Sequence, residues 1–122
     1  MRMTAEPSGE AAERDLDAEA QAAFDAIATR LLAEPDTDDH RAFHSPCLRV
    51  RRKIFAMLVR GELVVKLSPA RCAELVAAGD ARPFDRGQGT PMRSWITVDD
   101  LEIDAWPALA EEALVFVRGG AS

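Results

Sequence analysis

The sequence lacks tyrosine and asparagine, and its 122 residues include only two lysines and two cysteines. No apolar run approaches the roughly 20 residues that a membrane-spanning helix needs. The acidic residues 1–17 contain no apolar stretch, which argues against a secretory signal there. Cys47 and Cys72 show no C-x-x-C spacing, so part-buried, reduced thiols are expected, with one disulfide between them as the alternative. Together these absences predict a soluble cytoplasmic protein.

The composition is that of an ordinary globular protein, with 48% hydrophobic and 30% charged residues. A chain of this length is expected to form one domain with a real core. We expect residues 1–14 to be a disordered acidic N-terminus, residues 15–118 to be the folded domain and residues 119–122 to be a short tail.

The first half of the domain combines a helical stripe with a strand. In residues 16–33 apolar side chains recur every three or four positions, which predicts a helix that ends before Pro35. Residues 34–40 are polar and are expected to form a connection. Residues 43–51 predict a strand with Cys47, Leu48 and Val50 in the core. Because proline cannot donate to a ladder, this strand should lie at an edge or begin after Pro46.

The strongest local pattern is a β-hairpin. Two apolar runs, residues 53–59 and 63–67, meet at a turn in which Gly61 supplies a positive φ. Alternation divides the apolar residues of the first run between two faces: Ile54, Ala56 and Leu58 on one, Phe55, Met57 and Val59 on the other. Since both faces are apolar, this strand is expected to be central. Lys66 lies among apolar neighbours, either with its tip in water or as a desolvated amine.

The second half begins with a helix that Ser68 caps and Pro69 opens, and that ends at Gly79. Short strands are expected at residues 82–84 and 92–98, separated by a loop at residues 85–91, and a last helix at residues 105–117 is capped by Asp104. Trp95 and Trp106 are expected in or at the edge of one core. The other residues expected in that core are Phe24, Ile27, Phe55, Leu67, Leu75 and Leu114. The order predicts an α+β domain, α-β3-α-β2-α, with a mostly antiparallel five-stranded sheet.

Charge is distributed in three blocks. Residues 1–40 carry three arginines against eleven acids, residues 41–98 carry eleven basic residues against four acids, and residues 99–122 carry one arginine against six acids. The net charges are therefore −8, +7 and −5. The basic middle block predicts either a face for an anionic partner or a sheet whose charge is compensated by acidic terminal helices.

Seven basic residues are the candidates for a partner-binding or anion-binding surface: Arg49, Arg51, Arg52, Lys66, Arg82, Arg86 and Arg93. Such a surface suits phosphate groups, but no recognition-helix motif accompanies it. Gly87 and Gly89 allow a backbone to approach an anion, although their spacing matches neither a P-loop nor a dinucleotide fingerprint. His40 and His44 have a metal-binding spacing for a helix, but a loop entering a strand is predicted there.

Several of these residues, taken in order, resemble the N-terminal domain of the TfoX (Sxy) competence regulators and the related MmcQ/YjbR-like proteins. The resemblance rests on four features: residues 53–56 and 64–67 around Gly61, Pro83-Phe84-Asp85 after Gly79, then Gly87, and finally Met92 and Trp95. It covers residues 20–118 and implies the secretion-chaperone-like fold of the YgaC/TfoX-N-like group. Residues 42–45 lack the glycine that such domains often carry there.

The resemblance implies no catalytic residue, and the second domain of a full-length TfoX regulator lies outside the part that matches. We therefore expect a non-enzymatic cytosolic protein that acts in regulation by binding another macromolecule, first of all a protein. The alternatives are a nucleic-acid-binding module that uses the basic residues 41–98 and a small-molecule binder at the Gly87–Gly89 loop. No cofactor, no metal and no membrane partner are expected.

Overall fold

The computed structural model describes residues 8–42, 45–84 and 92–119. In chain order its elements are α1 (Ser8–Leu31), β1 (Thr37–Ala42), β2 (Ser45–Val50), β3 (Lys53–Val59), β4 (Glu62–Lys66), α2 (Pro69–Ala77), β5 (Arg82–Phe84), β6 (Met92–Val98), the 3-10 helix η1 (Asp100–Ala105) and α3 (Trp106–Arg118). The strands form one antiparallel sheet in the order β1-β2-β3-β4-β6-β5. The predicted α+β class is confirmed, but the sheet has six strands where five were expected.

The additional strand is β1, which the polar sequence of residues 34–40 had marked as a connection. It pairs only with β2, from Thr37 opposite Val50 to Ala42 opposite Ser45, and therefore forms an edge of the sheet. Asp38, Asp39 and His40 are exposed along it. Charged residues are common on edge strands because they discourage pairing with other chains. An edge strand of this kind has no apolar alternation by which the sequence would reveal it.

Two other predicted boundaries are wrong. The first helix begins at Ser8, eight residues before the apolar stripe that predicted a start at residue 16. The second strand includes Pro46 and is not an edge strand, since it lies between β1 and β3. Pro46 pairs with Arg41 in β1 and has no partner in β3, because the ladder with β3 begins only at Cys47. Cys47, Leu48 and Val50 are buried, as expected.

The β3–β4 hairpin is confirmed. Its two turn residues, Arg60 and Gly61, both have positive φ, 52° and 77°. This is the geometry of the two-residue turns that match the twist of antiparallel strands. The prediction assigned positive φ to Gly61 alone, and Arg60 adopts it as well, at a position where most side chains are disfavoured.

A β-bulge in β3 changes which face Phe55 occupies. Leu48 of β2 pairs with Ala56 and Arg49 pairs with Ile54, so Phe55 is an extra residue on the β3 side. Bulges re-aim side chains in this way. Phe55 is therefore buried in the same core cluster as Ala56 and Leu58, while Ile54 and Met57 are half-buried outside it. Strict alternation assigned Phe55 to the wrong face.

Helix α2 has the predicted caps. The Ser68 side chain accepts a hydrogen bond from the Arg71 amide at 3.2 Å, and Pro69 occupies the first turn. At the other end Gly79 has a φ of 82°, and the amides of Gly79 and Asp80 donate to the carbonyls of Val76 and Leu75. These two bonds define a Schellman motif, which satisfies carbonyls that the helix leaves open.

Helix α3 begins differently from the prediction. Asp104 belongs to η1 and does not cap α3, because the residue at the cap is Ala105, which has no capping side chain. Trp106 opens α3 and donates from its indole Nε1 to the Asp99 carbonyl at 3.1 Å. This bond fastens the start of α3 to the end of β6.

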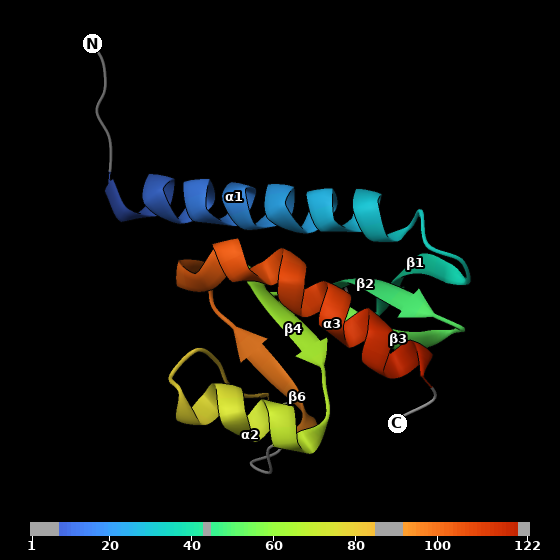
Figure 1. The fold of residues 1–122 in the computed structure, drawn as a ribbon. Coiled ribbons are helices and arrows are strands. Elements are labelled where there is room, and N and C mark those ends of the chain that lie inside the picture. Colours follow the sequence, from blue (N-terminus) through green and yellow to red (C-terminus); the bar gives the residue numbers. More distant parts are fainter. Residues whose placement is uncertain (1–7, 43–44, 85–91, 120–122) are drawn as a thin grey trace.

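The helices cover one face of the sheet. Figure 1 shows α3 crossing the sheet, α1 lying alongside α3, and α2 at the end where β6 lies. One cluster of buried side chains fills the space between them, and it includes Phe24, Ile27, Phe55, Leu67, Leu75, Trp106 and Leu114. All seven were predicted to share a core. Trp95 was predicted with them but is half-buried and lies outside the cluster.

Candidate functional site

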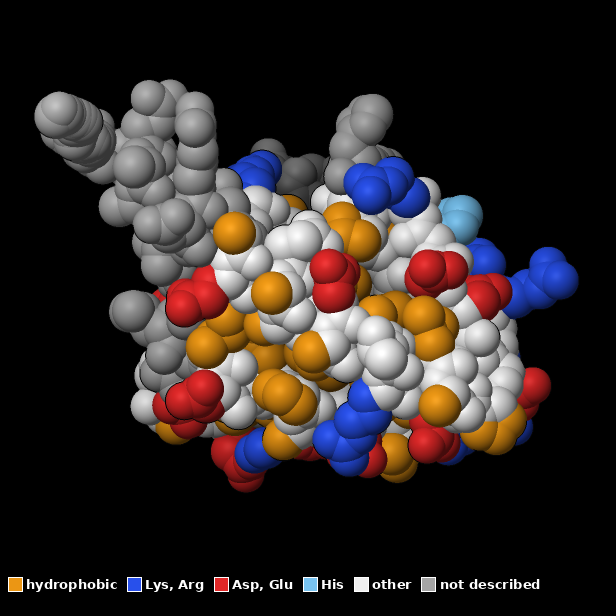
Figure 2. Space-filling model, turned by 90° about the horizontal axis from the view of Figure 1, so that it is seen from above, with side chains coloured by type: hydrophobic (Ala, Val, Ile, Leu, Met, Phe, Trp, Pro, Cys, Tyr) orange, Lys and Arg blue, Asp and Glu red, His pale blue; other side chains and the backbone are white. Residues whose placement is uncertain are grey.

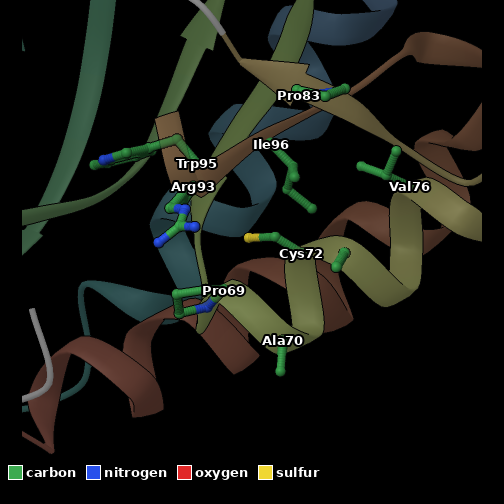
Figure 3. A pocket seen from close by; sticks show the side chains of 9 residues that line it. Pro69, Ala70, Cys72, Val76, Pro83, Arg93, Trp95 and Ile96 are labelled. Atoms are coloured by element: carbon green, nitrogen blue, oxygen red, sulfur yellow. The ribbon is translucent and has the colours of Figure 1, made fainter. Parts of the chain in front are cut away.

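A groove of about 550 Å³ lies between α2 and the β5–β6 end of the sheet (Figure 3). We call it the α2–β6 groove. Its lining residues are Pro69, Ala70, Cys72, Ala73 and Val76 on α2, Pro83 on β5, and Arg93, Trp95 and Ile96 on β6. All except Arg93 are apolar. A cavity of this size with a few polar groups is typical of sites that bind a small ligand or an anchoring side chain.

Arg93 supplies the only charge among these lining residues. Its side chain is exposed, and it makes no ion pair with any residue that the structure describes. In Figure 3 its guanidinium lies beside the space between Cys72 and Pro69. A guanidinium that has no ion-pair partner among the described residues, at the rim of an apolar groove, favours a ligand that carries a carboxylate or phosphate next to an apolar group.

Cys72 lines the inner wall of the α2–β6 groove and is a buried thiol, as is Cys47, so the predicted reduced state holds for both. Its Sγ lies 3.7 Å from the Leu67 carbonyl oxygen. Burial raises the pKa of the Cys72 thiol above its ordinary value. The thiol is therefore protonated at neutral pH, and a protonated thiol is a poor nucleophile and metal ligand.

Lys66 lies on the face of the sheet opposite the core. Its Nζ is 5.9 Å from the centre of the Trp95 ring, which is its cross-strand neighbour on β6. Both side chains are half-buried. The contact is a cation–π pair at the outer limit of the usual distance, and it explains why a lysine occurs among apolar residues in β4.

Three arginines of the predicted surface are paired with carboxylates. Arg49 binds Asp38 in a bidentate fashion, from Nε at 2.8 Å and from Nη2 at 2.9 Å. Arg82 donates to Glu62 at 2.5 Å, and Arg51 lies 3.7 Å from Asp36. Three of the seven basic residues predicted for a partner are thus paired with carboxylates within the fold.

The remaining predicted residues are scattered. Arg52 is exposed in the β2–β3 turn with a φ of 68°, while Arg93 borders the α2–β6 groove at the other side of the sheet. Arg86, like Gly87 and Gly89, lies outside the described residues. The structure therefore does not bring the described members of the set together as one basic surface.

The acidic ends of the chain compensate the basic middle. Arg71 of α2 donates to Glu112 of α3 at 2.8 Å and also pairs with Glu74. Arg118 pairs with Glu34 at 3.2 Å. Together with the Arg49–Asp38 and Arg51–Asp36 pairs, these bonds connect all three charge blocks, which supports the compensating interpretation of the charge pattern.

The Asp38 carboxyl is expected to titrate below its ordinary pKa of 3.8, because Arg49 donates hydrogen bonds to its ionised form. A lowered pKa in the folded state means that the pair stabilises the fold above the unfolded pKa, and that this contribution is lost as the pH falls through the folded value. An NMR titration of the side-chain carboxyl measures the pKa of Asp38. Arg49→Gln should return the midpoint toward 3.8, and Arg51→Gln should leave it in place; an unmoved midpoint in Arg49→Gln would contradict the pairing.

The other predicted sites find less support. His40 lies exposed in β1 opposite Cys47, and His44 lies outside the described residues. No group of three or more histidine, cysteine, aspartate or glutamate residues in the described part of the chain is arranged to hold a metal. Within the same part, none of the helices combines the length and apolarity that crossing a membrane requires.

The face formed by α1 is different in character from the groove. Figure 2 shows hydrophobic side chains there interspersed with polar surface, acidic side chains and several Lys or Arg side chains. Of the large hydrophobic residues that the structure describes, only Val115 is strongly exposed, at 62%. Scattered apolar residues of this kind are normal on a monomer surface.

Sequence reasoning missed most of the α2–β6 groove. Of its residues it had singled out Arg93 as a surface cation, Trp95 as a residue in or at the edge of the core, Cys72 as a reduced thiol and Pro69 as the start of a helix. The sequence did carry one signal of the groove, because α2 has apolar residues beyond those that face the core. Pro69, Ala70 and Ala73 add apolar surface that the core does not use.

Comparison with known proteins gives one match. The family model described as YjbR matches residues 32–114, which is more than half of the chain. Neither the curated proteins nor the solved structures include a match to this sequence. The matched region extends from the end of α1 through most of α3 and so contains the whole sheet and the α2–β6 groove.

Proposed function

The chain belongs to the YjbR family, and we propose that it is a non-enzymatic cytoplasmic regulator that binds another protein through the α2–β6 groove. The observation that carries the proposal is the groove itself, a cavity of about 550 Å³ whose described lining residues are apolar except for Arg93. Interfaces of this kind bind through one or two anchoring side chains that fill a pocket.

The chemistry of the groove indicates the kind of partner. Its apolar walls suit a large aliphatic or aromatic side chain, and Arg93 suits an aspartate or glutamate close to that side chain. We therefore expect the partner to present an exposed segment with one apolar anchor and at least one neighbouring acidic residue.

Binding is favoured over catalysis because of the polar groups available. The groove offers one guanidinium and one thiol, and the raised pKa of the Cys72 thiol leaves it protonated. Neither group serves as a general base at neutral pH. Nucleic-acid binding is less favoured because Arg49 and Arg51 already have carboxylate partners and the described members of the basic set do not form one surface.

A closer kinship with the N-terminal domain of the TfoX regulators is part of the same proposal. It is supported by the ordered residues around the β3–β4 hairpin and by Trp95, which here contributes to the groove. A regulatory role would follow from that kinship. The YjbR match supports the wider group and does not distinguish its members.

A random peptide library displayed on phage tests the proposal directly. Selection against the full chain should enrich a large apolar residue with aspartate or glutamate beside it. A synthetic peptide with that consensus should bind Arg93→Glu at least about tenfold more weakly, since a charge-assisted hydrogen bond is replaced by repulsion. Ala73→Glu, which places a charge on the groove wall, should weaken it as well.

Lys53→Glu is the matched control for the charge reversal. Lys53 is exposed, stands at the start of a strand as Arg93 does, and makes no ion pair with the described residues, but it lies outside the groove. The control should bind like the natural chain. The proposal fails if selection yields no consensus, or if Lys53→Glu weakens binding as much as Arg93→Glu.

A further inference from the structure

A second pocket lies beside the β3–β4 turn. It has a volume of about 230 Å³ and is lined by Val59, Arg60, Glu62, Val64, Arg82, Pro83, Phe84 and Thr97. We call it the outer-face pocket. Because Ile96 and Val98 belong to the core cluster, the Thr97 side chain between them points to the opposite face of the sheet. Its cross-strand neighbours Val64 and Arg82 line the same pocket.

Thr97 is the feature that the fold itself does not explain. It is 6% exposed, and no other polar residue in the described part of the chain is buried. Its hydroxyl makes no hydrogen bond with the described residues. Buried hydroxyl groups are nearly always hydrogen-bonded because leaving one without a partner is costly. A polar group that faces a pocket in this way is placed to bond to whatever occupies the pocket.

The charged groups of the outer-face pocket are arranged around an ion pair. Glu62 accepts a hydrogen bond from Arg82 Nη2 at 2.5 Å, which orients the guanidinium and leaves its other N–H groups available. Arg60, in the turn, is exposed and makes no ion pair with any described residue. Two guanidinium groups and one carboxylate give the pocket an excess of one positive charge.

We propose that the outer-face pocket binds a small organic oxyanion, a carboxylate or a phosphate monoester. Arg60 and Arg82 hold its oxygens, the Thr97 hydroxyl donates to it, and Val59 and Phe84 contact its carbon part. The proposal is independent of the protein-binding function, because Pro83 is the only described residue that lines both the α2–β6 groove and this pocket. Failure of one leaves the other in place.

An NMR titration of the ¹⁵N-labelled full chain tests this. Inorganic phosphate and acetate are added separately at constant ionic strength, with chloride as the reference anion, so that the two oxyanion classes are compared. Saturable shifts are expected in the amides of Gly61, Val64 and Thr97. Arg60→Gln should weaken binding about tenfold, and Thr97→Val, which keeps the side-chain shape, about threefold or more.

Arg52→Gln provides the control. Arg52 is also an exposed turn arginine with positive φ, 68° against 52° for Arg60, and it lies at the other end of β3. The Arg52→Gln variant should bind phosphate and acetate like the natural chain. The proposal is overturned if neither anion gives saturable shifts, if Arg52→Gln and Arg60→Gln weaken binding equally, or if Thr97→Val leaves the affinity unchanged.

Discussion

Phe55→Ala is expected to lower the free energy of unfolding by about 3–5 kcal/mol, which is a large part of the stability of a small domain. Phe55 is fully buried and belongs to the core cluster under the helices. Its removal leaves a cavity between the sheet and those helices that the surrounding side chains fill only in part. Urea denaturation followed by circular dichroism measures the loss.

Ile54 is the matched comparison because it is the neighbouring residue on the same strand. Ile54 is half-buried and lies outside the core cluster, so Ile54→Ala should lower the free energy of unfolding by about 1 kcal/mol. Lys53→Ala, at an exposed position, should stay within about 0.5 kcal/mol. If Ile54→Ala proved as costly as Phe55→Ala, the bulge would be misplaced. Small losses for all three would mean that β3 is not central.

The elements that sequence reasoning recovers are those with a local signal. The hairpin around Gly61 follows from two apolar runs and a turn residue, and α2 follows from Ser68, Pro69 and Gly79. Each signal lies within a few residues of the structure it specifies. The same is true of the apolar stripe of α3.

The features that it misses depend on pairing between distant segments. Strand β1 exists because its backbone hydrogen-bonds to β2, and its own side chains, such as Asp38 and Asp39, give no strand pattern. The bulge at Phe55 depends on how β3 aligns with β2, which alternation along β3 does not reveal. A shift of one residue exchanges the two faces of a strand, so the face that alternation assigned to Phe55 is wrong for a reason that local reasoning could not detect, although its burial was predicted.

The candidate site shows the same limit. Counting charges identified Arg49 and Arg82 as surface cations, but whether a cation is available depends on its neighbours in space. Glu62, the partner of Arg82, lies 20 residues away in sequence, and Glu112, the partner of Arg71, lies 41 away. The α2–β6 groove likewise forms where two elements meet, so its apolar lining is visible only in the fold.

Trp106→Ala is expected to cost about 3–5 kcal/mol of unfolding free energy, for two reasons that act together. The indole is fully buried in the core cluster, and its Nε1 donates to the Asp99 carbonyl at 3.1 Å. The substitution therefore leaves a large cavity and an acceptor without its donor. Chemical denaturation of the variant measures the sum of the two effects.

Trp106→Phe separates the two contributions. Phenylalanine fills much of the same volume but cannot donate, so the variant should lose about 1–3 kcal/mol, less than Trp106→Ala. Trp95→Phe is the control, because Trp95 is half-buried outside the core and its contact with Lys66 is a cation–π contact that phenylalanine retains in weaker form. Trp95→Phe should lower the free energy of unfolding by less than about 1 kcal/mol. If Trp95→Phe were the more costly of the two phenylalanine variants, the indole that fastens α3 to the sheet would not be Trp106.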